Sequence, residues 1–138
     1  MLTLNFKVPK KFNSISLSEP IKDSIAIYTN KLRNQVVTNT PFKSWTLRRS
    51  IQSDISNNWM KAEIWTNIVY APIQEFGWII RPKTKPYLTF KIDGKWIRTK
   101  KSVIKWKEYF QKAMKKFNEA SFNKILVNEL KSYLNKLK

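Results

Sequence analysis

The chain has 138 residues, with 27 Lys and Arg, 9 Asp and Glu, no His and no Cys, which gives a formal net charge of +18. Its length fits one domain with a modest core. The lack of His and Cys excludes Ser-His-Asp and Cys-His catalysis, imidazole or thiolate metal sites, and disulfides. The only glycines are Gly77 and Gly94, which excludes a glycine-rich phosphate loop. No apolar run approaches the roughly 18 residues of a membrane span. The cationic C-terminal helices could lie on an anionic membrane, but we expect their apolar stripe to pack on the sheet instead, and so we expect no membrane partner.

Half of the net charge lies in one segment. Residues 81–107 hold ten Lys and Arg against one acid, Asp93, which is a net charge of +9. Such a segment attracts polyanions, of which nucleic acid is the commonest in a cell. Coding bias is the other explanation, because Lys outnumbers Arg 22 to 5, as is typical of AT-rich genomes. Lys reads base edges less well than Arg, so we expect no sequence-specific DNA recognition.

The N-terminal third of the sequence predicts an arm and a helix. Residues 1–17 open with alternating apolar residues, which is typical of an extended arm or edge strand. Ser18 is a suitable N-cap, and the apolar residues that follow it recur at helical spacing. We therefore expect an amphipathic helix over residues 18–37, ended by Asn39 and Pro41.

A first hairpin is predicted because the apolar period changes to two from Leu47 onward. Residues 47–56 would pair with residues 59–68 across a tight turn at Asn57-Asn58. The pairs of opposite residues in this register are Ile51 and Ile64, Ser53 and Ala62, Asp54 and Lys61, and Ile55 and Met60. The opposite charges of the third pair support the register.

A second hairpin is predicted from Asp93-Gly94, a dipeptide typical of type I′ turns. Residues 88–92 would pair with residues 95–99, and residues 81–86 before them would form an extended basic loop. The pairs of opposite residues are then Leu88 and Thr99, Thr89 and Arg98, Phe90 and Ile97, Lys91 and Trp96, and Ile92 and Lys95.

A short helix is predicted between the two hairpins. Tyr70, Ile73 and Phe76 would share one of its sides, with Pro72 at its start and Gly77 at its end. Gly77 would permit a left-handed turn after the helix.

The C-terminal part predicts two consecutive helices, over residues 106–117 and 119–137, or one kinked helix. Either Asn118 or Ser121 would cap the second helix. We expect an apolar stripe on the second helix to be buried, consisting of Phe122, Leu126, Leu130 and Tyr133.

Together these elements predict an α+β fold. The two hairpins would form a four-stranded antiparallel sheet. The N-terminal helix, the short central helix and the long C-terminal helices would pack on that sheet. Residues 1–138 would be a single domain, with residues 1–17 as an extended N-terminal arm or edge strand.

The acidic residues predict no catalytic pair, so we expect no enzyme and no cofactor or metal. Glu129 and Lys131 have the Glu-x-Lys spacing of some nucleases, but no partner Asp lies on a nearby predicted strand. Asp93 belongs to a turn, and Asp54 and Glu63 belong to a solvated sheet face.

The aromatic residues indicate a partner. Trp96 is flanked by Lys91 and Arg98, a pattern typical of a stacking or cation–π platform. Burial under a helix or a neighbouring subunit is the alternative. Six Trp and eight Phe exceed what one modest core requires, which favours aromatic burial between subunits.

Several motifs, read in order, resemble the tail-completion (neck, head–tail joining) proteins of tailed bacteriophages. The family's signature Tyr-Ala-x-x-x-Glu-Phe-Gly is intact at residues 70–77. Residues 44–51 are similar to the Thr-Gly-x-Leu-Arg-x-Ser-Ile start of the family's first strand, and residues 80–90 resemble a variant of its next strand. Trp45 replaces a glycine and Lys107-Glu108 replaces Arg-Pro, so the backbone can differ at both points. The resemblance covers about residues 20–137.

The resemblance implies a virion structural protein, made in the host cytoplasm, that forms a ring in the neck. The ring, expected to be a hexamer, would join the head connector to the tail and surround the DNA channel. Its partners would be further copies of itself, the adjacent connector and tail-tube or tail-terminator proteins, and genomic DNA through transient, non-specific contacts. The alternative is a free-standing small basic protein that binds nucleic acid non-specifically.

Two sets of contact residues follow. The predicted oligomer or partner contacts are Arg48, Arg49, Glu75, Phe76 and Trp96. Within this set Glu75 would pair with Arg48 or Arg49, and Phe76 would anchor the short helix. The predicted DNA-channel or acidic-partner contacts are Arg81, Lys83, Lys85, Lys91, Lys95, Arg98, Lys100 and Lys101.

Overall fold

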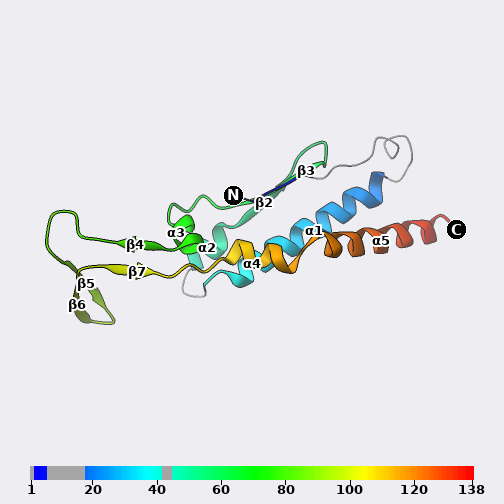
Figure 1. The fold of residues 1–138 in the computed structure, drawn as a ribbon. Helices are drawn as coiled ribbons and strands as arrows, with labels where there is room; N and C mark the ends of the chain where they lie inside the picture. Colours follow the sequence, from blue (N-terminus) through cyan, green and yellow to red (C-terminus); the bar gives the residue numbers. More distant parts are fainter. Residues whose placement is uncertain (1, 6–17, 42–44) are drawn as a thin grey trace. The chain divides into compact units, whose positions relative to one another are not determined.

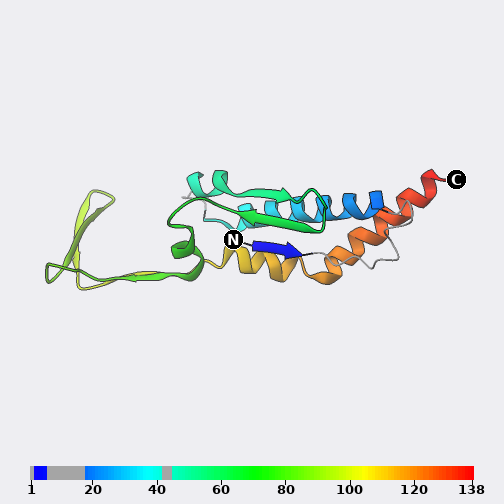
Figure 2. The same cartoon turned by 90° about the horizontal axis from the view of Figure 1, so that it is seen from above.

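The structure is a computed structural model that describes residues 2–5, 18–41 and 45–138. It has an α+β fold, as predicted, with helices and small antiparallel sheets (Figures 1 and 2). The chain forms two compact units. We call Met1–Ile68 with Tyr109–Lys138 the helical unit, and Val69–Glu108 the ribbon unit. That residues 1–138 are one tail-completion-like domain stays a prediction.

The predicted four-stranded sheet does not form, because the strands belong to three separate sheets. In the helical unit, β1 (Leu2–Asn5), β3 (Lys61–Trp65) and β2 (Gln52–Ile55) form a sheet in the order β1-β3-β2. In the ribbon unit, β4 (Trp78–Ile80) pairs with β7 (Ser102–Ile104), and β5 (Leu88–Ile92) pairs with β6 (Lys95–Thr99). The two predicted hairpins therefore lie in different sheets.

Helix α1 (Ser18–Asn39) is the centre of the helical unit (Figure 1). It confirms the predicted helix and continues two residues further than expected. Its buried apolar residues, spaced by three or four, are Ile21, Ile25, Tyr28, Leu32 and Val36. It packs against β2 and β3, and also against α4 (Tyr109–Lys116) and α5 (Glu119–Lys136).

The sheet of the helical unit has one apolar and one polar face. Ile64 lies opposite Leu2 on one side and Ser53 on the other, while Ala62 lies opposite Leu4 and Ile55. Ile64 and Ala62 are fully buried. The predicted edge strand is thus confirmed for residues 2–5, and the rest of the predicted arm lies outside the described residues.

The register of the first hairpin differs from the prediction by two residues. Ile55 lies opposite Ala62 rather than Met60, and Asp54 lies opposite Glu63 rather than Lys61. The tight Asn57-Asn58 turn is replaced by a longer loop. Because side chains alternate with a period of two, a shift of two keeps the same residues on the buried face.

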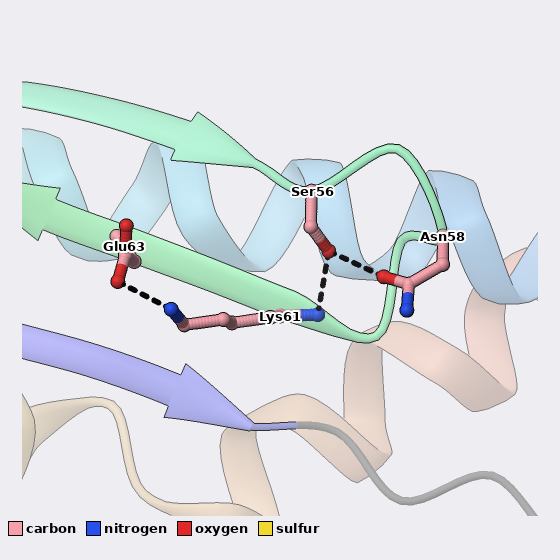
Figure 3. A network of polar contacts seen from close by, with 4 residues as sticks. All are labelled: Ser56, Asn58, Lys61 and Glu63. Carbon is pink, nitrogen blue, oxygen red and sulfur yellow. Dashed lines mark hydrogen bonds and ion pairs between the residues drawn. The ribbon is translucent and has the colours of Figure 1, made fainter.

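Polar contacts hold this longer loop (Figure 3). The Ser56 hydroxyl donates to Asn58 Oδ1 at 2.6 Å and accepts from the Lys61 backbone N–H at 3.2 Å. Trp59 takes a positive φ of 54°. Lys61 Nζ pairs with Glu63 Oε1 at 2.7 Å, so this lysine neutralises a residue of its own strand.

The residues that were expected to begin the first strand form a helix instead. Residues Trp45–Ser50 form α2, and the strand begins only at Gln52. Leu47 and Ile51 are both fully buried. Their spacing of four fits one side of a helical turn as well as one side of a strand, which is why the pattern was ambiguous.

The C-terminal region forms two helices, as predicted, but α4 starts at Tyr109 rather than at residue 106. Asn118 is the N-cap of α5, and its side chain accepts from the Ser121 N–H at 3.2 Å. The predicted burial of Phe122, Leu126, Leu130 and Tyr133 is wrong in degree, since all four are half-buried and no residue of α5 is fully buried. The helix lies against α1, which covers its apolar stripe only in part.

Tyr28 joins α1 to the C-terminal helices. Its ring packs edge-on against Phe117, with centroids 6.4 Å apart, and against Phe122, with centroids 5.5 Å apart. Its hydroxyl donates to the Phe117 carbonyl oxygen just beyond the end of α4. Burial raises the pKa of the Tyr28 hydroxyl above its usual value of 10.0.

Replacing Tyr28 by Phe should remove both this hydrogen bond and part of the alkaline sensitivity. At neutral pH we expect Tyr28→Phe to lower the free energy of unfolding by about 0.5–1.5 kcal/mol, the net value of one hydrogen bond. Above pH 10 the unfolded chain releases the Tyr28 proton more readily than the folded chain, so the wild type loses stability as pH rises. Denaturant titrations between neutral and alkaline pH measure both effects. Tyr133→Phe is the control, and equal alkaline slopes for wild type and Tyr28→Phe would contradict the assignment.

Candidate functional site

The ribbon unit has almost no core of its own. Within Val69–Glu108 only Ala71 and Glu75 are buried, and both lie on the short helix α3 (Ala71–Phe76). Two-stranded sheets are marginally stable in water unless another layer covers one face. The ribbon unit therefore depends on cover from outside its own residues.

The strands β4 and β7 form a ribbon that is apolar on both faces, which we call the apolar ribbon. Trp78 lies opposite Ile104, and Ile79 lies opposite Val103 on the other face. Trp78, Ile79 and Val103 are between 52% and 61% exposed. Strands with apolar residues on both faces are typical of sheets that are covered on both sides.

A groove of about 560 Å³ runs along the apolar ribbon. Its lining residues are Phe76, Gly77, Trp78, Ile79, Val103, Ile104, Lys105 and Trp106. Seven of these eight residues lack a charged side chain, so the groove fits an apolar partner surface.

Gly77 sets the distance between the start and the end of the apolar ribbon. Its backbone has φ 74° and ψ 170°, a region that is essentially restricted to glycine. A Cβ atom here would lie 2.8 Å from the Ile104 carbonyl oxygen and 3.0 Å from the Trp106 nitrogen. The predicted positive φ is confirmed, but ψ is extended, so the turn is not left-handed helical.

Backbone hydrogen bonds tie α3 to the end of the apolar ribbon. The Gly77 N–H donates to the Ile73 carbonyl at 2.8 Å and ends the helix. The Lys107 N–H donates to the Gln74 carbonyl at 2.8 Å, and the Glu108 N–H donates to the Glu75 carbonyl at 3.2 Å. The predicted short helix and its terminating glycine are therefore confirmed.

Phe76 does not anchor this helix, contrary to the prediction. Its side chain is 64% exposed and lines the groove, while Ala71 and Glu75 form the buried side of α3. An exposed phenylalanine beside an apolar groove is available to a partner. Phe76 thus stays a predicted partner contact for a different reason.

The second hairpin has the predicted register at every position. Alternation along the strands gives it two different faces. One face is apolar and carries Leu88, Phe90, Ile92 and Ile97. The other face, which we call the basic face, carries Tyr87, Lys91, Trp96 and Arg98.

The basic face combines rings and cations. Trp96 is 72% exposed, and Lys91 Nζ lies 6.0 Å from the centroid of its ring. Arg98 Cζ lies 4.3 Å from the centroid of the Tyr87 ring, so this arginine stacks on Tyr87 rather than on Trp96. The predicted contact of Lys91 with Trp96 is present, and that of Arg98 is not; that Trp96 binds a partner stays a prediction.

The eight predicted DNA-channel or acidic-partner residues are all exposed: Arg81, Lys83, Lys85, Lys91, Lys95, Arg98, Lys100 and Lys101. Among residues 2–5, 18–41 and 45–138, Lys22 pairs with Glu19 and Lys61 pairs with Glu63, and none of the eight takes part in these ion pairs. Their charge is therefore uncompensated by neighbouring carboxylates. This leaves a strong positive potential on the ribbon unit.

Arg48 has a structural role that was not predicted from the sequence. Its Nε donates to the Thr40 carbonyl at 3.0 Å, and a terminal nitrogen donates to the Thr38 carbonyl at 3.3 Å. These carbonyls belong to the C-terminal end of α1, whose last turn contains no basic residue. A cation at this end offsets the negative pole of the helix.

The neighbouring Arg49 is exposed on α2. The predicted pairing of Glu75 with Arg48 or Arg49 joins residues of two different units, and it stays a prediction.

The described residues contain no group of three or more acidic side chains that could hold a metal ion. Nor does any helix among them have the length and apolar character needed to cross a membrane.

No family model matches the chain, and neither the curated proteins nor the solved structures contain a significant match. The apolar ribbon and the basic face are therefore the features that support a function.

Replacing Gly77 by Ala should open the apolar ribbon. The strained backbone and the contact with two backbone atoms should together lower the stability of β4 and β7 by about 1–3 kcal/mol. Hydrogen exchange of the β4 and β7 amides measures this loss. Gly94→Ala is the matched control, because Gly94 also has a positive φ, of 81°, but has no atom within 4 Å of its Cβ position. Equal protection of β4 in wild type and Gly77→Ala would refute the argument.

Arg48→Gln and Arg49→Gln should differ although they are adjacent. Arg48→Gln removes charge-assisted bonds to the end of α1, so we expect it to lower the free energy of unfolding by about 1–3 kcal/mol. Arg49→Gln should change it by less than about 0.5 kcal/mol, as is usual for an exposed residue. Chemical denaturation of both variants tests this, and similar losses would remove the structural role of Arg48.

Proposed function

We propose that the chain is a structural protein of the virion of a tailed bacteriophage. It assembles as a ring in the neck, between the head connector and the tail, and surrounds the DNA channel. The motifs at residues 44–51, 70–77 and 80–90, which are similar to those of tail-completion proteins, suggest this particular assembly. The observation that carries the proposal is the lack of a core in the ribbon unit.

The apolar ribbon supports assembly because its exposed residues are of the kind that protein interfaces bury. Interface centres are enriched in aromatic residues and depleted in charged ones. Trp78, Ile79 and Val103 fit this composition, and Phe76 and Trp106 extend it along the groove. Exposed apolar patches of this kind mark interaction sites in soluble proteins. A neighbouring copy that covers the ribbon would supply the missing layer.

A ring follows when the ribbon of one copy meets a different surface of the next copy. Such a head-to-tail contact repeats around an axis and closes if the rotation allows it. The copy number of six is expected from the family resemblance. The adjacent connector and tail-tube or tail-terminator proteins would contact the two sides of the ring, and genomic DNA would pass through it with non-specific contacts.

The alternative, a free-standing small basic protein that binds nucleic acid non-specifically, is favoured by one observation. The eight predicted cationic contacts are exposed and unpaired with carboxylates. This alternative leaves the apolar ribbon without cover, so it accounts for fewer residues than the ring.

The oligomeric state tests the proposal. We expect the purified chain to form a ring in light scattering and negative-stain electron microscopy, either alone or after mixing with purified connector. The double variant Ile79→Thr and Val103→Thr keeps β-branched side chains, so it should fold but lose assembly. Val127→Thr is the control, because Val127 is also about half exposed but lies on α5.

Two outcomes would contradict the ring. One is a chain that stays monomeric at all concentrations, alone and with the connector. The other is a ring that forms equally well from the double ribbon variant and from Val127→Thr.

A further inference from the structure

We propose that the basic face of the β5–β6 hairpin binds single-stranded nucleic acid. An unpaired base stacks on Trp96, and Lys91 and Arg98 hold the phosphates on either side. This inference goes beyond the proposed ring and does not depend on it, because it rests on a different pair of strands.

Trp96 supplies the stacking surface. Its indole is 72% exposed, and it is the second residue of β6, with Lys91 directly opposite. Stacking of a base on an aromatic side chain tolerates any sequence, because every base has a π face. Lys91 Nζ, at 6.0 Å from the ring centroid, is close enough to contact the phosphate of a base stacked there.

Arg98 supplies the second contact. It lies on the same face as Trp96, two residues further along β6, and its guanidinium rests on the Tyr87 ring at 4.3 Å. This contact restrains a long side chain and leaves its N–H groups free of carboxylate partners. A positioned guanidinium binds phosphate oxygens in two-bond geometry and also stacks on bases.

The charge around the face favours a polyanion. Within residues 81–107 the one acid is Asp93, which lies in the turn between β5 and β6. The exposed lysines therefore attract phosphates without competition from neighbouring carboxylates. Binding through such contacts releases counterions and weakens as salt rises.

A single strand fits this face better than a duplex. In a duplex each base face is covered by the next base, so only edges and phosphates are accessible. A duplex would use the cations of the ribbon unit and gain nothing from Trp96. A single strand can use both the cations and the ring.

The test compares oligo(dT) with a duplex of equal length, using fluorescence anisotropy and the purified full-length chain. Trp96→Ala should lower the affinity for oligo(dT) about tenfold, the typical effect of losing one stacked base. It should change the affinity for the duplex by less than about twofold, since the charge is unchanged. Trp96→Phe keeps a ring on the same strand and should retain most of the oligo(dT) affinity, which separates lost stacking from a lost hairpin.

Lys91 and Lys95 provide a matched pair. Both are exposed, both lie in the hairpin, and their replacement by Gln removes the same charge. Lys91 lies on the basic face, whereas Lys95 lies opposite Ile92 on the apolar face. Lys91→Gln should reduce the slope of log affinity against log salt for oligo(dT) by about 0.7, and Lys95→Gln should leave it unchanged.

Three results would overturn the inference. The wild type fails to bind oligo(dT) at low salt, or Lys91→Gln and Lys95→Gln weaken binding equally, or Trp96→Ala weakens duplex and single strand equally. Either of the last two results would mean that the hairpin contributes only general positive charge and no stacking site. A chain that binds oligo(dT) as expected but never forms a ring would remove the proposed function alone.

Discussion

The burial of α1 is the interaction on which the rest of the chain depends. This helix packs against β2 and β3 and against α4 and α5, and the buried residues of β3 and α4 lie in the elements around it. Its own buried stripe ends in Thr40, whose carbonyl accepts from Arg48. Among the described residues, the helical unit holds the buried apolar residues except Ala71, although it also exposes Trp45, Val127 and Leu134. In the ribbon unit only Ala71 and Glu75 are buried. The ribbon unit is therefore the part of the described chain that buries least apolar surface.

Local signals predicted much of the fold. The Asp93-Gly94 turn determined the register of β5 and β6, because a two-residue turn leaves no freedom in pairing. Helical periodicity and a capping asparagine predicted α1 and the break before α5. The predicted register of the first hairpin was wrong because the length of its loop was ambiguous. Trp59 accepts a positive φ there, supported by the side chains of Ser56 and Asn58, and nothing in the alternation of the strands distinguishes the two loop lengths.

The pairing of β4 with β7 could not be predicted from the sequence, for a different reason. Its strands are three residues long and are separated by the whole β5–β6 hairpin, so no turn signal links them. The short apolar runs at residues 78–80 and 103–104 were the available signal, yet runs this short fit several structures. The site was predicted where it depends on charge and alternation, as for Lys91 and Trp96. It was not predicted where it depends on long-range contacts, as for Arg48 at the end of α1 and Phe76 at the groove.

The coexistence of an apolar ribbon and a strongly basic segment favours a head-to-tail contact over a symmetric one. In a two-fold dimer that pairs ribbon with ribbon, two segments of net charge +9 would lie side by side and repel each other. Lysines along unpaired strands also discourage edge-to-edge association of free copies. In a head-to-tail contact the ribbon of one copy meets a different surface of the next, so the two basic segments need not lie side by side. The concentrated charge is thus compatible with the proposed ring, in which the apolar faces would be covered and the basic faces would stay accessible to a polyanion.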